Sequence, residues 1–161
     1  NKVDCERTAF QQLEKTDIQI PKLIYANDVE NYLIKEFVDG KVASEIIADN
    51  QLSDEILVQL FKFAAIAKKH QFNIDYFPSN FIITPTNTLH YIDYETNPYH
   101  EQWDLPNWGI YYWANSNGFK QFMMNGNAAN INVSADSGIP IKLPFQKLVN
   151  DWIHRFQTEE N

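Results

Sequence analysis

The most constraining stretch of the chain starts at Asp75, passes Asn80 and ends at Asp93. Between Asn80 and Asp93 lie two apolar runs, at residues 81–83 and 89–92, separated by the turn-forming sequence Pro-Thr-Asn-Thr. This pattern predicts two short strands joined by a turn. Because a hairpin reverses the direction of the chain, we expect Asn80 and Asp93 to lie close together at its open end.

These residue types in this order are typical of a metal-assisted phosphoryl-transfer site. One carboxylate, here Asp75, orients the attacking hydroxyl or accepts its proton. An amide oxygen and a second carboxylate, here Asn80 and Asp93, hold Mg²⁺ against the nucleotide phosphates. Mg²⁺ keeps several water and phosphate ligands, so two protein ligands are sufficient. The spacing from Asp75 to Asn80 alone also arises by chance in turns, so further motifs are needed.

Further motifs resemble the protein-kinase-like fold, in its aminoglycoside and choline phosphotransferase branch. Residues 73–80, Asn-Ile-Asp-Tyr-Phe-Pro-Ser-Asn, resemble the His-Gly-Asp-x-x-x-x-Asn loop of that branch. Residues 92–95, Ile-Asp-Tyr-Glu, resemble the segment that follows its hairpin. Residues 32–40 are similar to the strand, hinge and glycine between its two lobes, and residues 102–105 to the start of its next helix. Residues 5–13 resemble the helix whose Glu pairs with the nucleotide-binding Lys.

The resemblance spans roughly residues 4–115 and implies further roles for individual residues. ATP and Mg are the implied cofactors. Glu6 would pair with a nucleotide-binding Lys. The hinge residues would face the adenine through backbone groups: Glu36, Phe37 and Val38. Asp104 would cap the helix that begins at Leu105 or would support the loop that carries Asp75.

The chain also departs from the pattern of this branch. Asn73 stands where the branch usually has His, and neither the Gly-rich phosphate loop nor the nucleotide-binding Lys is present. We therefore expect an N-terminally truncated, single kinase-like domain fragment over residues 1–161. Residues 1–38 would be the remnant of the N-terminal lobe and hinge, and residues 39–161 the helical C-terminal lobe. The fold class predicted is α+β, mainly α-helical with a small β remnant and a catalytic-loop β-hairpin.

Hydrophobic periodicity and capping residues predict most of the remaining elements. Residues 22–26 and 32–38 are predicted strands, and residues 127–138 a loop. Ser53 is a predicted N-cap, with acidic residues following it and basic residues at the far end of its helix, as the helix dipole favours. Helices are predicted over residues 4–15, 42–48, 54–70, 105–115 and 119–124 and from Pro144 onward, with residues 157–161 fraying.

Composition and charge limit the classes of partner that this chain is expected to bind. The net charge of −8 would repel a nucleic-acid backbone, so no nucleic-acid partner is expected. A single cysteine rules out an internal disulfide, and no apolar run is long enough for a membrane span. We therefore expect a cytoplasmic protein without a membrane partner, which binds a nucleotide and a small-molecule acceptor. The sequence does not predict the oligomeric state or the identity of the acceptor.

Three functions remain open on these residues. The first is an ATP- and Mg-dependent phosphotransferase that acts on a hydroxyl group. A small-molecule acceptor is favoured over a protein acceptor. The alternative is a non-catalytic pseudokinase or protein-interaction module, which Asn73 and the missing phosphate loop favour. A metal-dependent hydrolase that uses Asp75 and Asp93 ranks third, because two-metal hydrolases usually add further ligands. The four histidines lack zinc-ligand spacing, and no nucleophile elbow is present.

Overall fold

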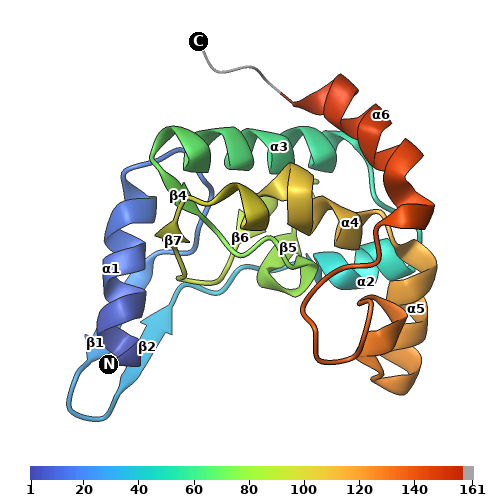
Figure 1. The fold of residues 1–161 in the computed structure, drawn as a ribbon. Helices are drawn as coiled ribbons and strands as arrows, with labels where there is room; N and C mark the ends of the chain where they lie inside the picture. Colours follow the sequence, from blue (N-terminus) through green and yellow to red (C-terminus); the bar gives the residue numbers. More distant parts are fainter. Residues whose placement is uncertain (158–161) are drawn as a thin grey trace.

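The computed structural model describes residues 1–157 and has an α+β fold that places helices around small antiparallel sheets (Figure 1). The α-helices are α1 (Lys2–Glu14), α2 (Ala43–Ala48), α3 (Asp54–Lys69), α4 (Ile110–Trp113), α5 (Ser116–Asn125) and α6 (Gln146–Phe156). The strands are β1 (Leu23–Asn27), β2 (Tyr32–Lys35), β3 (Lys41–Val42), β4 (Phe72–Asn73), β5 (Phe81–Ile83), β6 (Leu89–Tyr91) and β7 (Asn97–Pro98). No helix within the described residues is long and apolar enough to cross a membrane.

Helix α3 forms the main support of the core, and its start is set by a side-chain cap. The Ser53 hydroxyl accepts a hydrogen bond from the amide of Ile56, which satisfies one of the free donors of the first turn, as predicted. The buried face of α3 consists of Ile56, Leu57, Leu60, Phe61, Phe63 and Ala67. This stripe joins the main hydrophobic cluster, and α6 packs on the same helix, with the centres of the Phe61 and Phe156 rings 6.2 Å apart (Figure 1).

The predicted hairpin is confirmed as β5 and β6, which pair antiparallel with Phe81 opposite Tyr91 and Ile83 opposite Leu89. Its turn closes when the Thr84 amide donates to the carbonyl of Thr88 at 3.0 Å. Strand β3 extends the sheet on the other side of β5. Gly40 precedes β3 and approaches β5 so closely that a Cβ there would lie 2.3 Å from the Ile83 carbonyl oxygen.

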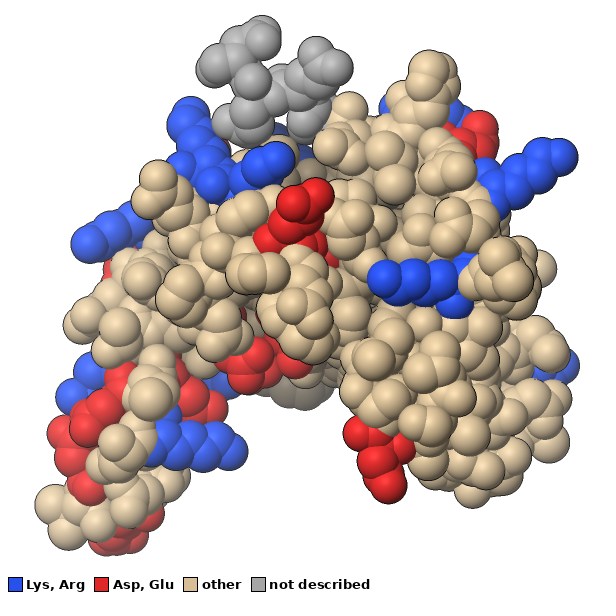
Figure 2. Space-filling model, in the orientation of Figure 1, with Lys and Arg blue, Asp and Glu red and all other residues tan. Residues whose placement is uncertain are grey.

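The N-terminal part forms a separate wing of the molecule, in which α1 lies beside the β1–β2 hairpin (Figure 1). Strand β2 ends at Lys35 rather than at Val38, so residues 36–38 are extended but unpaired apart from a bond between the Glu36 amide and the Lys22 carbonyl at 2.8 Å. Figure 2 shows acidic side chains gathered over this wing and a hollow between it and the body that contains α5. The β1–β2 hairpin of this wing therefore projects from the helical body, whereas the end of α1 joins the core through Leu13.

The segment predicted as one helix over residues 105–115 has two parts. Leu105–Gly109 form a π-helical turn, and α4 follows at Ile110. Gly109 packs directly on the loop after β4, since a Cβ at Gly109 would lie 2.3 Å from the Cβ of Tyr76. A residue with a side chain would therefore push this helix away from the loop, and the wide π-turn brings the two backbones into contact.

The C-terminal part follows the predicted pattern with shifted starts. Helix α5 ends at Gly126, whose left-handed backbone (φ 69°) closes its last turn. The predicted loop contains a short helical turn at Ala128–Asn130 and a bridge between Asn132 and Pro140. Pro144 lies in a 3-10 turn, and α6 begins after it, at Gln146. The predicted fraying covers residues 157–161; α6 ends at Phe156 with Gln157 as its C-cap, and residues 158–161 lie outside the described residues.

Gly109→Ala should lower the free energy of unfolding by about 1–3 kcal/mol, because the added methyl group meets backbone-proximal atoms that cannot rotate away. Urea unfolding measures this loss. Asn117→Ala, an exposed change in α5, is the control and should stay within about 0.5 kcal/mol of the parent. Equal stability of the two variants would contradict the close packing between Gly109 and Tyr76.

Candidate functional site

Asp75 lies in the loop that follows β4, and its position is fixed by three hydrogen bonds. Its amide donates to the Tyr91 hydroxyl at 3.0 Å. Its carboxylate accepts from the Phe77 amide at 3.1 Å. Its carbonyl accepts from the side-chain amide of Asn80 at 3.4 Å. These bonds hold a partly exposed carboxylate in one orientation, as a group that must meet a ligand requires.

The base of the β5–β6 hairpin brings Asn80 and Asp93 to the same loop, as predicted. Asn80 ends the short helical turn Pro78–Asn80 just before β5, and its carbonyl accepts from the Ile92 amide at 2.9 Å. Asp93 follows Ile92 directly. The Tyr91 hydroxyl, at the end of β6, donates to the carbonyl of Glu95 at 2.9 Å and so holds the segment that follows the hairpin. The chain therefore leaves the hairpin along the loop that carries Asp75.

Asp75, Asp93 and Glu95 form a carboxylate cluster at this point. One carboxylate oxygen from each residue lies within 4.8 Å of the oxygens from the other two. Asp75 and Asp93 are half-buried, whereas Glu95 is exposed. Glu95 belongs to the motif at residues 92–95, but no role was predicted for it. Its separation from Asp93 by one residue was the available signal, because alternate residues of an extended segment share a face.

Asp75 and Glu95 hold their protons more tightly than free carboxylates do. Burial raises the pKa of Asp75 first, and the nearby Asp93 charge adds to this, while the bonds from Phe77 and Asn80 act in the opposite direction. The pKa of Glu95 is also raised, by partial burial and then by Asp75 and Asp93. A divalent cation would relieve this mutual repulsion, and carboxylate and amide oxygens are the ligands that Mg²⁺ prefers.

Lys35 is a cation beside this cluster that the sequence pattern did not reveal. Its ammonium group donates to the carbonyl of Ile92 at 3.2 Å and lies 4.1 Å from the centre of the Tyr94 ring. These two contacts bracket Asp93 and join the end of β2 to the candidate site. Lys35 lies in the short strand next to the predicted hinge, and only the long-range packing of that strand determines its place.

The residues predicted as the hinge, Glu36, Phe37 and Val38, directly follow Lys35 in the chain. The contact of Lys35 with Ile92 therefore places them next to the candidate site. Within residues 1–157, neither Phe37 nor Val38 donates a backbone hydrogen bond outside the helices and strands, and the Phe37 side chain is exposed. Their amide groups therefore have no backbone acceptor within residues 1–157. Glu6, in α1, forms no ion pair with any described residue, and its charge contributes to the raised pKa of Tyr94.

Asp104 takes a structural position, as its predicted role requires. Its carboxylate accepts from the amide and the side chain of Asn107, at 3.0 and 2.9 Å, and from the Tyr99 hydroxyl at 2.9 Å. It therefore caps the π-helical turn. Among the described residues, its side chain makes no direct hydrogen bond to the loop at residues 73–80. Of the two roles considered for Asp104, the structure shows the cap.

A small pocket adjoins the carboxylate cluster. Its volume is about 350 Å³, and both Asp75 and Glu95 line it. Trp103 and Trp108 form part of its wall and meet edge to face, with ring centres 5.9 Å apart. The other aromatic residues of this region belong to the core, since Tyr111, Tyr112 and Trp113 are all buried. The pocket is large enough for a small molecule whose polar group meets Asp75.

Tyr91→Phe should destabilise the protein by about 1–3 kcal/mol, because it leaves the Asp75 amide and the Glu95 carbonyl without their shared partner. Urea unfolding measures the loss. Tyr111→Phe is the matched control, since Tyr111 is also buried but its hydroxyl has no hydrogen-bond partner among residues 1–157. A loss at Tyr91 no larger than that at Tyr111 would refute the linking role of the Tyr91 hydroxyl.

The raised pKa of Asp75 predicts a pH-dependent effect of Asp75→Asn in the presence of a chelator. Folding favours the protonated carboxyl, so this contribution to stability is present below the unfolded pKa and is lost as the pH rises through the folded pKa. Asn cannot ionise and still accepts from Phe77. Its melting temperature relative to the parent should therefore increase between about pH 4 and about pH 8. For the control Asp49→Asn, at an exposed carboxylate, the melting-temperature difference from the parent should stay constant with pH. A melting-temperature difference that falls as the pH rises for Asp75→Asn would contradict the assigned burial.

Comparison with family models and with curated proteins identifies no relative of this chain. The chain matches no family model, and no curated protein matches its sequence. The functional assignment therefore depends on the carboxylate cluster, its neighbouring amide and cation, and the pocket beside it.

Proposed function

We propose that the chain is part of a kinase-like phosphotransferase that transfers the γ-phosphoryl group of ATP, with Mg²⁺, to a hydroxyl of a small molecule. In this proposal Asp75 orients the acceptor hydroxyl, and Asn80 and Asp93 hold the metal. The kinase-like assignment comes from the sequence resemblance, and the geometry of these side chains supports it.

The observation that carries the proposal is the meeting of Asp75 and Asp93 beside Asn80. The two carboxylates are far apart in the chain, yet their oxygens approach within 4.8 Å. A phosphoryl-transfer site needs one carboxylate for the acceptor and another for the metal, both within reach of the same phosphate. Mutual repulsion in the unliganded cluster disfavours two full charges, and bound Mg²⁺ would offset that repulsion.

The nucleotide would enter from the side of the hinge. Backbone groups of Phe37 and Val38 would bind the base, and Lys35 would lie between the base and the metal site, on the carbonyl of Ile92. In this position the ammonium group would attract the phosphates and hold the backbone next to Asp93. Glu6 would pair with the nucleotide-binding Lys that the resemblance implies.

The acceptor would occupy the pocket lined by Asp75 and Glu95. Its acidic groups and the Trp103 and Trp108 side chains suit an acceptor that combines a hydroxyl with a positive charge, because aromatic rings and carboxylates both attract cations. The pocket volume of about 350 Å³ favours a small molecule over a folded protein. A protein acceptor would have to present a single side chain to this pocket.

A non-catalytic, nucleotide-binding module is the second candidate, and Asn73 favours it. The residue is buried, and its side chain donates to the carbonyl of His100 at 2.9 Å. Its side chain therefore joins the loop to the segment around His100 and has a structural role. If the module is non-catalytic, the complete natural protein should bind Mg·ATP without transferring phosphate.

Two variants separate metal binding from chemistry in the complete natural protein. Asp93→Asn should weaken Mg·ATP binding at least about tenfold, or ~1.4 kcal/mol, since the neutral amide loses the attraction to the ion. Asp75→Ala should bind Mg·ATP almost normally and slow transfer by about a hundredfold or more. Calorimetry measures the first quantity and single-turnover phosphate transfer the second.

Asp49→Asn is the control for both measurements, because Asp49 is an exposed carboxylate that follows α2, outside the cluster. It should leave nucleotide affinity and transfer unchanged. The metal assignment fails if Asp93→Asn binds Mg·ATP as tightly as the control does. The assignment of Asp75 fails if its alanine variant transfers phosphate within a factor of a few of the control.

A further inference from the structure

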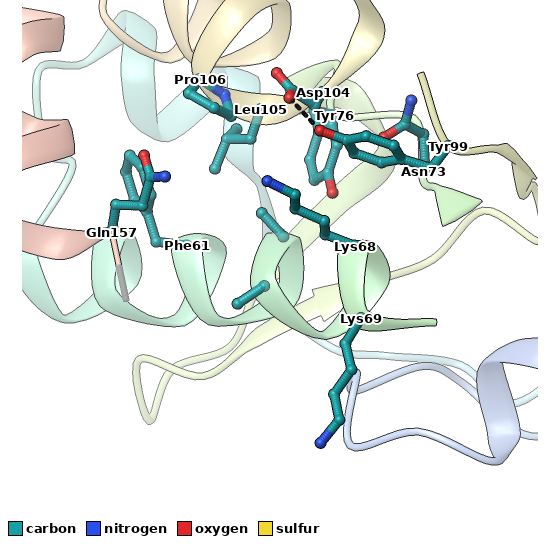
Figure 3. Close-up of a pocket in the computed structure, with 12 residues that line it drawn as sticks. Phe61, Lys68, Lys69, Asn73, Tyr76, Tyr99, Asp104, Leu105, Pro106 and Gln157 are labelled. Atoms are coloured by element: carbon teal, nitrogen blue, oxygen red, sulfur yellow. Dashed lines mark hydrogen bonds between the residues drawn. The ribbon is translucent and has the colours of Figure 1, made fainter. Parts of the chain in front are cut away.

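A second and larger cavity, of about 580 Å³, lies behind the loop that carries Asp75 (Figure 3). One wall is the last part of α3, with Phe61 and Lys68, and the other is the start of the π-helical turn, with Asp104 and Leu105. The loop contributes residues on either side of Asp75 but not Asp75 itself. The cavity is thus distinct from the pocket that Asp75 lines, although Asn73 lines both.

Tyr76 presents an unpartnered donor to this cavity. The side chain is 1% exposed, and its hydroxyl has no hydrogen-bond partner among residues 1–157. Figure 3 shows the hydroxyl directed into the space that Lys68 also enters. Burial raises the pKa of Tyr76, and the nearby Asp104 charge raises it further, so the hydroxyl keeps its proton and remains a donor. Because no described protein group accepts from this hydroxyl, it is free to donate to a ligand with an acceptor atom.

Lys68 supplies an unpaired cation at the same end of the cavity. Its ammonium group lies 5.7 Å from the centre of the Tyr99 ring and forms no salt bridge with any described residue. Figure 3 shows this side chain directed inward from α3, whereas the neighbouring Lys69 points away. An ammonium group and a protonated hydroxyl that converge in one space form a receptor for an anion.

The one carboxylate that lines the cavity among residues 1–157 already accepts from three donors. Asp104 accepts hydrogen bonds from two groups of Asn107 and from the Tyr99 hydroxyl. Its oxygens therefore have little capacity left for a cationic ligand. The remaining walls near α3 and the π-helical turn are apolar, with Phe61, Ala64 and Leu105 among them. The cavity offers a cation and a donor at one end and an apolar surface next to them.

We propose that this cavity binds a small amphipathic carboxylate, whose anionic head lies between Lys68 and Tyr76 and whose planar apolar body lies against Phe61 and Leu105. The volume of about 580 Å³ is within the usual range for small-molecule sites. The bound molecule would contact Asn73 and Tyr76, the residues of the loop that flank Ile74 and Asp75.

Calorimetric titration of the protein with 2-naphthoate, a planar aromatic carboxylate, tests the proposal. The parent protein should bind one equivalent. Lys68→Gln should weaken binding about tenfold, the scale of one charge-assisted hydrogen bond, and Tyr76→Phe about fivefold. Lys62→Gln is the matched control on the same helix, because Lys62 is exposed and does not line the cavity. It should bind as the parent does.

Two further measurements keep the result decisive. 2-Naphthylmethylamine has the same rings with the opposite charge and should bind at least about tenfold more weakly than 2-naphthoate. Ala65→Trp should fill the cavity and abolish binding, with an unfolding transition that shows the variant is folded. The proposal is overturned if 2-naphthoate fails to saturate the parent, if Lys68→Gln and Lys62→Gln bind equally well, or if the amine binds as tightly as the carboxylate.

Discussion

The candidate site depends on the Tyr91 hydroxyl, which joins the two parts of the chain that carry its carboxylates. It accepts from the Asp75 amide on one side and donates to the Glu95 carbonyl on the other. Tyr91 is itself placed by the pairing of β6 with β5 and is fully buried beside Phe81. The hairpin register therefore controls the distance between the loop carboxylate and those that follow the hairpin.

This arrangement brings like charges together, and the Lys35 ammonium group beside them already has other partners. Asp75 and Glu95 both have raised pKa values, first through burial and then through neighbouring carboxylates. The ammonium group of Lys35 contacts the carbonyl of Ile92 and the face of Tyr94. Repulsion of this kind is common where a site is built to receive a charged ligand. A bound divalent cation would make the electrostatic energy of the clustered carboxylates favourable.

Features set by local sequence were predictable, and those set by distant packing were not. The Ser53 cap and the hairpin were predictable, because turn and cap residues act over a few positions. The hairpin also fixed the meeting of Asn80 with the Asp93 segment. Lys35 could not be placed from sequence, because its contact with Ile92 spans 57 residues of the chain. Gly109 of the π-turn packs against Tyr76 across a long stretch of chain. The cavity behind the loop is likewise lined by residues from distant segments, among them α3, the loop at residues 73–76, the start of the π-helical turn and Gln157.

The most direct test of the proposed metal site is a crystal of the complete natural protein soaked with Mn²⁺ and a non-hydrolysable ATP analogue, with the metal located by its anomalous scattering. Mn²⁺ replaces Mg²⁺ at oxygen-ligand sites and identifies its own position. We expect a peak within bonding distance of Asn80 and Asp93, at about 2.0–2.3 Å, with the base against residues 36–38. A metal bound elsewhere, or a nucleotide that does not contact Asp93 through the metal, would contradict the proposed site.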